Sequence, residues 1–325
     1  WCVEQYTTVT RPRKGQLFTT FNDCYPIIQF GAAILPRLDK KPLPTAHKRM
    51  TIAGKISVKY AQFDNGVPIF VMLINLQTIY KPLTLPEAAE HLMRPGVYPL
   101  YGSGASIIRP NSRDIIEAVD LSGVLDSEVT IDKSAYIAIS AGALLPTVIA
   151  AVRKLSPDVA AIIEAEAPES TRNVLTVGDV LLECNPNSLS LAVLYGLEAE
   201  IAVFAGNSSY TVDVETWFNR TPDQRRSLLI DEIECPWFPK SNFAVAFEKV
   251  SRTPADAPIV AAIGFVTPDS DPFAIVVGVA DRPVHYRVGL QSSVNDYKGS
   301  AEYRTQMAKV LSERAISRAT QVAQA

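Results

Sequence analysis

The sequence is poor in the side chains that bind metal ions or iron–sulfur clusters. Its 325 residues include four cysteines and three histidines, and no two cysteines form a C-x-x-C pair. Because such sites need closely spaced thiolate or imidazole ligands, we expect this chain to hold no metal ion or cluster of its own. The cysteines are also too few and too scattered for a disulfide framework, which favours a reducing compartment and a cytoplasmic location.

Long apolar runs and a large excess of one charge are missing as well. The longest apolar stretch, residues 137–152, contains Ser140, Gly142 and Pro146, so we expect it to form part of a core and not a membrane span. Lys and Arg together number 31 and Asp and Glu 34, which gives a net charge of −3. This balance argues against nucleic acid as the main partner, because phosphate binding requires a concentrated basic surface.

None of the common catalytic motifs is present: there is no G-x-S-x-G, H-E-x-x-H, P-loop or G-x-G-x-x-G. Two loops of small residues are left as candidate ligand sites. Residues 102–106, Gly-Ser-Gly-Ala-Ser, would let backbone N–H groups approach an anion, although a tight turn is an equally good interpretation. Residues 176–179, Thr-Val-Gly-Asp, are similar, but their carboxylate would repel a phosphate, so a simple turn is favoured there.

The first part of the chain differs in composition from the rest. Residues 1–50 lack periodicity and are rich in Pro, Thr and basic residues, which predicts an extended arm or peripheral loops. In residues 51–79, an alternating apolar pattern, the turn signal Asp64-Asn65-Gly66 and a second apolar run predict a β-hairpin. We therefore set residues 1–78 apart as an N-terminal arm with a hairpin.

The rest of the chain alternates between helix and strand signals. Thr84, Pro86 and Glu87 predict a helix that starts with a capping box, and Gly96 lies just beyond its end. The other predicted helices span residues 146–155, 159–167, 188–196 and 302–324, and the predicted strands span residues 115–121, 135–143, 199–204, 210–214, 243–249, 258–265 and 273–279.

The last predicted helix carries apolar residues at helical spacing, and we expect one buried stripe along it. The stripe consists of Tyr303, Met307, Val310, Leu311 and Ile316. Together with the strands before it, this helix completes an α+β fold with mixed sheets, without the regular βαβ period of a barrel or a doubly wound sheet.

Taken in chain order, short motifs in these segments resemble a known family. They are found at residues 80–89, 102–105, 118–122, 139–143, 173–178, 185–188, 247–256 and 299–304. The most specific lie late in the chain, in Phe-Glu-Lys-Val-Ser-Arg-Thr-Pro-Ala-Asp at 247–256 and Gly-Ser-Ala-Glu-Tyr-Arg at 299–304. This order is similar to that of the FAD-binding medium subunit of the molybdenum hydroxylases, the flavoprotein of carbon monoxide dehydrogenase and xanthine dehydrogenase.

The resemblance implies a fold and a set of domains. Residues 79–236 would form an FAD-binding PCMH-type domain of two subdomains, and residues 237–325 a C-terminal α/β domain like that of the carbon monoxide dehydrogenase flavoprotein. It also implies a function, in which bound FAD carries electrons received from iron–sulfur and molybdopterin subunits. The chain would then be an oxidoreductase flavoprotein subunit that is not catalytically complete alone.

The resemblance also implies which residues bind the flavin. A first loop would offer its N–H groups to the pyrophosphate, a second loop would clamp it, and a lysine would lie near the polar edge of the flavin ring. In this order the residues are Gly102, Ser103, Gly104 and Ala105, then Thr176, Val177 and Gly178, and finally Lys249.

The motifs depart from the family pattern where the ligand would bind. Ser103 replaces a glycine of the first loop, Asp179 replaces the second glycine of the second loop, and Leu189 replaces an aspartate. An acidic side chain beside a diphosphate costs on the order of 1–4 kcal/mol near a surface. The alternative is therefore a relative without flavin that acts as a structural or interaction subunit of a larger complex, gripping a partner with residues 1–78.

Overall fold

The computed structural model describes residues 55–57, 75–102, 115–132, 136–236, 243–253, 256–268 and 270–324. These residues belong to one compact unit, His47–Ala325. Most of the expected arm and the turn of the expected hairpin lie outside the described residues, as do Ser103, Gly104 and Ala105. Within the described ranges, no helix combines the length and the apolar character that crossing a bilayer requires.

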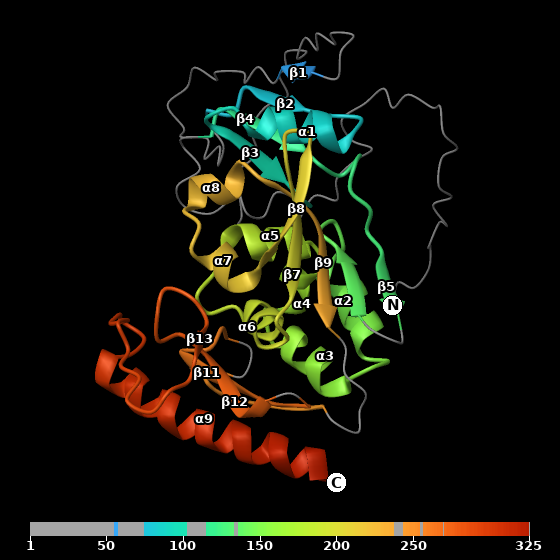
Figure 1. Cartoon of the computed structure of the whole chain (residues 1–325). Coiled ribbons are helices and arrows are strands. Elements are labelled where there is room, and N and C mark those ends of the chain that lie inside the picture. The colour runs from blue at the N-terminus through green and yellow to red at the C-terminus, as the bar shows by residue number, and fades with distance from the viewer. Residues whose placement is uncertain are drawn as a thin grey trace, which may run out of the picture. The chain divides into compact units, whose positions relative to one another are not determined.

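A small sheet of four strands begins the described part of the chain (Figure 1). Its order is β1 (Lys55–Ser57), β2 (Thr78–Tyr80), β4 (Glu117–Asp120), β3 (Val97–Leu100). The first pair is antiparallel, as a hairpin requires, whereas β2, β4 and β3 run parallel. Helix α1 (Leu85–Leu92) connects β2 to β3, which run in the same direction on the two sides of β4.

Local sequence signals explain the start and end of α1. The Thr84 side chain accepts a hydrogen bond from the Glu87 N–H, at 3.3 Å, so the expected N-cap is confirmed. The Glu87 carboxylate accepts from Leu83, at 2.8 Å, and not from Thr84, so the predicted capping box is displaced by one residue. Beyond the helix, Gly96 has a φ of +80°, a conformation that favours glycine.

A five-stranded antiparallel sheet follows, covered by a layer of helices. The strands, in sheet order, are β5 (Val129–Asp132), β6 (Tyr136–Ser140), β9 (Leu229–Pro236), β7 (Glu200–Ala205) and β8 (Ser208–Asp213). The helices are α2 (Leu145–Val152), α3 (Pro157–Glu164), α4 (Glu169–Arg172), α5 (Val177–Glu183), α6 (Leu189–Gly196), α7 (Val214–Phe218) and α8 (Pro222–Arg226). Most of the predicted elements in this region are confirmed. The strand β5 and the helices α4, α5, α7 and α8 were not predicted, and neither was β9. Acidic side chains at Asp231, Glu232 and Glu234 hide its apolar alternation, because such residues are rare in strands.

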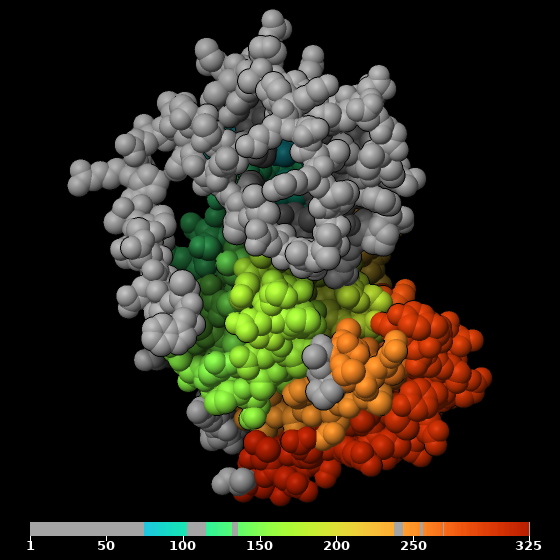
Figure 2. Space-filling model, turned by 180° about the vertical axis from the view of Figure 1, so that it is seen from behind, coloured from blue at the N-terminus to red at the C-terminus, as the bar shows by residue number. Residues whose placement is uncertain are grey.

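The C-terminal region is an antiparallel sheet with one long helix on its face. The strands are β10 (Ala244–Val250), β11 (Val260–Thr267), β12 (Ser270–Val277) and β13 (Val284–His285), and the helix is α9 (Ala301–Gln324). The other face of the sheet packs on the helical layer, where a Cβ added to Gly196 of α6 would lie 2.3 Å from the Phe265 ring. Figure 2 shows this junction from behind, with the green surface of the helical layer next to the orange C-terminal strands.

The buried stripe of α9 differs from the predicted one. Of the five predicted residues, only Leu311 is buried, and Tyr303 is exposed. The stripe that faces the sheet consists of Arg304, Ala308, Leu311, Ser312, Ala315 and Ala319. The reason is close approach: a Cβ added to Gly264 of β11 would lie 2.4 Å from the backbone of Ala315, so large side chains do not fit between helix and sheet.

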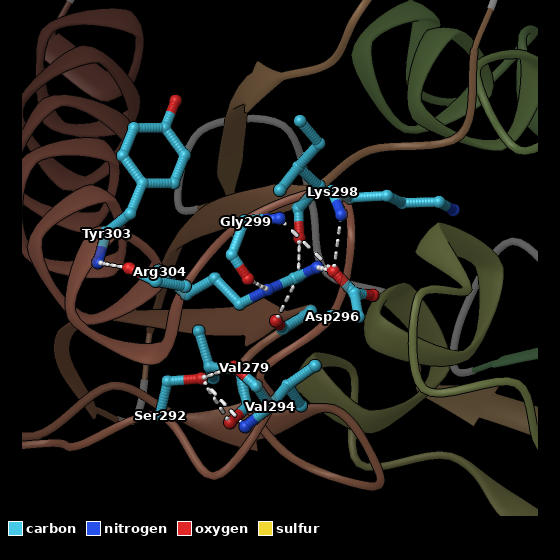
Figure 3. A network of polar contacts seen from close by, with 11 residues as sticks. Val279, Ser292, Val294, Asp296, Lys298, Gly299, Tyr303 and Arg304 are labelled. Atoms are coloured by element: carbon cyan, nitrogen blue, oxygen red, sulfur yellow. Dashed lines mark hydrogen bonds and ion pairs between the residues drawn. The ribbon is translucent and has the colours of Figure 1, made fainter.

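Arg304 ties this helix to the loops around it (Figure 3). The residue is 1% exposed, and its Nη1 donates to the carbonyl oxygens of Ile259, at 2.5 Å, and Gly278, at 2.7 Å. Its Nε donates to the Gly299 carbonyl, at 3.3 Å, and its Nη2 pairs with Asp296 Oδ1, at 2.7 Å. The guanidinium thus joins the β12 end, the loop before β11 and the loop before α9. With these sheets and helices, the predicted α+β class is confirmed.

Candidate functional site

The two loops singled out in the sequence contact each other, although they lie far apart along the chain. Gly102 follows β3, and Thr176 precedes the first turn of α5. A Cβ added to Gly102 would lie 2.7 Å from Thr176 Cγ2, 3.1 Å from Asp179 Oδ2 and 3.3 Å from the Val174 carbonyl. Only a residue without a side chain fits there, so the fold brings the described end of the first loop onto the second loop.

The Tyr101 ring packs against Gly178, next to the contact between the two loops. Tyr101 was not singled out from the sequence. A Cβ added to Gly178 would lie 2.4 Å from the Tyr101 ring and 2.9 Å from the Ala141 carbonyl. The Tyr101 hydroxyl accepts a hydrogen bond from the Ile230 N–H, at 2.8 Å, and complete burial raises the pKa of this phenol. The phenol is therefore neutral and held in place by its hydrogen bond. Gly178 is a glycine because α5 packs directly on the Tyr101 ring.

Residues 176–179 begin a helix and are not the simple turn that the sequence favoured. Asp179 is 0% exposed, and its Oδ2 accepts from the Thr176 N–H, at 3.2 Å, and from Thr176 Oγ1, at 2.9 Å. In return, the Asp179 N–H donates to Thr176 Oγ1, at 3.1 Å. These bonds form a complete capping box. The pattern Thr-x-x-Asp is the sequence signal that would have predicted it.

The remaining N–H groups of this turn also have partners inside the protein. The Val177 N–H donates to the Ala143 carbonyl, at 3.0 Å, and the Gly178 N–H donates to the Ala141 carbonyl, at 2.9 Å. An anion bound at such a turn needs N–H donors that point toward it and no competing carboxylate. As it stands, this end of α5 does not fit a diphosphate.

Lys249 lies in another part of the fold. It is on β10, opposite Ala261 of β11, and is half-buried. Its neighbour Glu248 pairs with Arg318 of α9, so the alternation of the strand places Lys249 on the face that packs against the helical layer. The structure thus brings the first and second loops together at Gly102, while Lys249 lies on the C-terminal sheet.

A cavity of about 230 Å³ lies on the side of α5 that faces away from Tyr101. Its lining includes Val180 and Glu183 of α5, Glu166, and Ala257 of the C-terminal region. The Glu166 carboxylate accepts from the Ser190 N–H, at 2.7 Å, at the start of α6, and its burial raises the pKa. Glu166 therefore caps α6 and links it to the segment between α3 and α4.

Comparison with known proteins identifies the family. A family model described as the FAD-binding domain in molybdopterin dehydrogenase matches residues 74–238, just over half of the chain. This chain belongs to that family. The resemblance found in the sequence motifs is thereby confirmed, and Gly102, Thr176, Val177 and Gly178 all lie inside the matched domain. No curated protein matches the sequence significantly.

Solved structures share the fold of this family member. Carbon monoxide dehydrogenase from Hydrogenophaga pseudoflava, in a form that lacks the Mo-pyranopterin moiety of the molybdenum cofactor, has a TM-score of 0.67 and 18% identity, covering 75% of this chain and 97% of that one. Reconstituted CO dehydrogenase from Oligotropha carboxidovorans has a TM-score of 0.65 and 20% identity, covering 74% and 96%. Quinoline 2-oxidoreductase from Pseudomonas putida 86 has a TM-score of 0.66 and 18% identity, covering 75% and 97%.

Proposed function

We propose that this chain is the FAD-binding electron-transfer subunit of a multi-subunit oxidoreductase of the molybdenum hydroxylase type. The observation that carries the proposal is the contact of Gly102 with Thr176 inside the matched FAD-binding domain. FAD supplies the redox chemistry, and the protein binds and orients it. Because the sequence lacks closely spaced cysteines, iron–sulfur and molybdopterin groups would belong to partner subunits, in the cytoplasm.

In this proposal the first loop carries most of the binding. Gly102, with Ser103, Gly104 and Ala105 after it, would offer backbone N–H groups to the diphosphate. Thr176, Val177 and Gly178 contribute less than their motif implies, because their N–H groups already donate to protein oxygens. Lys249 would approach the polar edge of the flavin ring from the C-terminal sheet, where a cation stabilises the reduced anionic ring.

The test is the absorption spectrum of the purified protein, followed by heat release and quantification of the flavin. Near-stoichiometric FAD, with the visible absorption bands of an oxidised flavin, is the expected result. A colourless protein whose Tm does not rise with added FAD would contradict the proposal, because specific binding to the native state raises stability.

A second candidate function is favoured by one observation, the buried Asp179 capping box. In this alternative the chain has kept the scaffold without the flavin and serves as a structural subunit, with residues 1–78 as its grip on a partner. Pull-down from the native source separates the two functions: a flavin-free chain in a stable complex supports the scaffold, and copurifying flavin supports electron transfer.

A further inference from the structure

The strand β8 lies at one edge of the five-stranded sheet. It pairs with β7 on one side, and no other strand in the described ranges pairs with its outer side (Figure 1). All of its residues except Val212 are exposed. The outer side of an edge strand carries N–H and C=O groups that can pair with a strand of another chain. A second strand can therefore be added to the sheet at β8.

The turn before β8 determines which of its backbone groups point outward. The two-residue turn Gly206-Asn207 joins β7 to β8, and Gly206 has a φ of +60°, as the first position of a type II′ turn requires. In such a hairpin the residue after the turn, Ser208, is hydrogen-bonded to its partner, and bonded and unbonded pairs then alternate. The N–H and C=O groups of Ser209 and Thr211 therefore point away from β7.

β8 lacks the features by which proteins commonly protect an open strand edge. It contains no Lys, Arg or Pro, and its register with β7 runs without a bulge. Its one charged residue, Asp213, accepts hydrogen bonds from the Thr216 N–H and hydroxyl, both at 2.7 Å. The opposite edge of the sheet differs, because β5 has only four residues, follows Glu128 and ends at Asp132. Of these two edges, β8 is the one suited to pairing.

The sequence of β8 allows it to pair with a second copy of itself. When the outward groups of Ser209 in one copy bond to those of Thr211 in the other, the strands run antiparallel and are related by a two-fold axis. Tyr210 then lies opposite Tyr210 of the second copy, and Asp213 lies opposite Asn207. No charged residue of the strand faces another in this register, so no like-charge repulsion opposes it.

Tyr210 supplies the apolar contact at the centre of this pairing. It is 39% exposed, and it lies on the same face of the sheet as the buried Val203, its partner on β7. The guanidinium of Arg220 lies 6.0 Å from the centre of the ring and packs on it within the same chain. Aromatic residues directly opposite each other on antiparallel strands stabilise the pair, so contact between the two rings would cover surface that is now exposed.

We propose that β8 is a homodimer interface, in which two copies of the chain pair antiparallel with Tyr210 at the two-fold axis. The five-stranded sheets of the two copies then form one continuous sheet. Because each copy covers the open edge of the other, the assembly closes at the dimer. The proposal does not involve the flavin, so it holds or fails separately from the proposed function.

Analytical ultracentrifugation of the full chain at rising concentration measures the dissociation constant of the dimer. Thr211→Pro removes the outward N–H group of both copies, and proline is tolerated on an edge strand whose N–H faces solvent. We expect the dissociation constant to rise about tenfold or more, because two hydrogen bonds are lost in each dimer. Thr211→Val is the matched control: it keeps the N–H group and the β-branched shape, so it should dimerise like the wild type. A monomeric wild type, or a dimer that Thr211→Pro leaves unchanged, would overturn the proposal.

Cysteine cross-linking tests the register and does not depend on the folding of the proline variant. Cys2 and Cys24 are first replaced by serine, and the other two cysteines are buried. In this background Tyr210→Cys places two thiols across the axis, with Cβ atoms about 4.5 Å apart, and we expect diamide to oxidise them to an intermolecular disulfide. Ser208→Cys is the control, because its two thiols would lie about 13 Å apart along the strands and should not cross-link. If both variants cross-link, or neither does, the proposed pairing is wrong.

Discussion

Arg304 and Asp179 are two of the charged residues buried in the described part of the chain, and they differ in what the charge holds together. Arg304 binds carbonyl oxygens of Ile259, Gly278 and Gly299 and pairs with Asp296, so it joins three segments of the C-terminal region (Figure 3). Asp179, in contrast, bonds to Thr176, three residues away, and seals the end of one short helix. Arg304 thus connects loops that are far apart in the chain, and Asp179 caps the first turn of α5.

The difference matters because both residues belong to motifs that resemble the same family. Arg304 agrees with the family pattern, and the structure gives it a role in holding the fold. Asp179 departs from the pattern, and in the structure its carboxylate accepts hydrogen bonds from the Thr176 N–H and hydroxyl. In this chain the parts of the motifs that build the scaffold are retained, and the part that would face the cofactor has changed.

The largest expected effect comes from removing the connecting charge. Arg304→Ala leaves three carbonyl oxygens and Asp296 without this partner, and we expect the free energy of unfolding to fall by about 3–5 kcal/mol. Urea unfolding followed by circular dichroism measures it. Arg318→Ala is the matched control on the same helix: its side chain is 59% exposed and pairs with Glu248, so the loss should be about 1 kcal/mol or less.

Equal losses for the two arginine variants would contradict the view that Arg304 joins the segments. Arg304→Lys sharpens the test, because an ammonium group retains the charge without the planar fork of donors. We expect it to recover part of the stability only.

Much of the fold follows from local patterns in the sequence. The Thr84 cap, the strand at β11 and the length of α9 were all predicted, because capping residues and apolar periodicity are local signals. The buried face of α9 was not, since it depends on how closely the helix approaches Gly264 of the neighbouring strand. That distance depends on how the helix and the strand pack together, so it cannot be read from the sequence of either element alone.

At the candidate site, too, the contacts between distant segments could not be predicted from local sequence patterns. Gly102 and Thr176 were singled out as loop residues, but nothing local says that they touch or that Tyr101 fills the space beneath them. Gly178 favoured a turn because glycine is common in turns, whereas here it lies in a helix and is required by the Tyr101 ring. The roles of the three remaining residues of the first loop and of Lys249 stay predictions.

A smaller effect tests why Gly178 is a glycine. Gly178→Ala would place a methyl group 2.4 Å from the Tyr101 ring, and we expect a loss of about 1–3 kcal/mol in the protein without flavin. Gly123→Ala is the control, because its nearest neighbour would be the Pro82 carbonyl, at 3.9 Å, and its stability should change by about 0.5 kcal/mol at most. If Gly178→Ala were as stable as Gly123→Ala, the glycine would be kept for a ligand and not for packing.

The smallest expected effect is a dependence of the Tm on pH that comes from Asp296, the ion-pair partner of Arg304. The hydrogen bond from Arg304 lowers the pKa of Asp296 below its ordinary value of 3.8. Its contribution to stability is therefore present above pH 3.8 and is lost as the pH falls through the lowered pKa. Asp296→Asn should accordingly have a lower Tm than the wild type at pH 7, and the difference should shrink in acid.

Glu232 should show the opposite sign in the same experiment. Burial, and then the neighbouring Glu234 and Asp231, raise its pKa above the ordinary value of 4.5. A raised pKa stabilises the fold below pH 4.5, and this contribution is lost as the pH rises through the raised value. Glu232→Gln should therefore have a higher Tm than the wild type at pH 7, with the gap closing below pH 4.5. If Asp296→Asn and Glu232→Gln both raised the Tm at pH 7, or both lowered it, the two pKa shifts would not have the opposite signs that the contacts of Asp296 and Glu232 indicate.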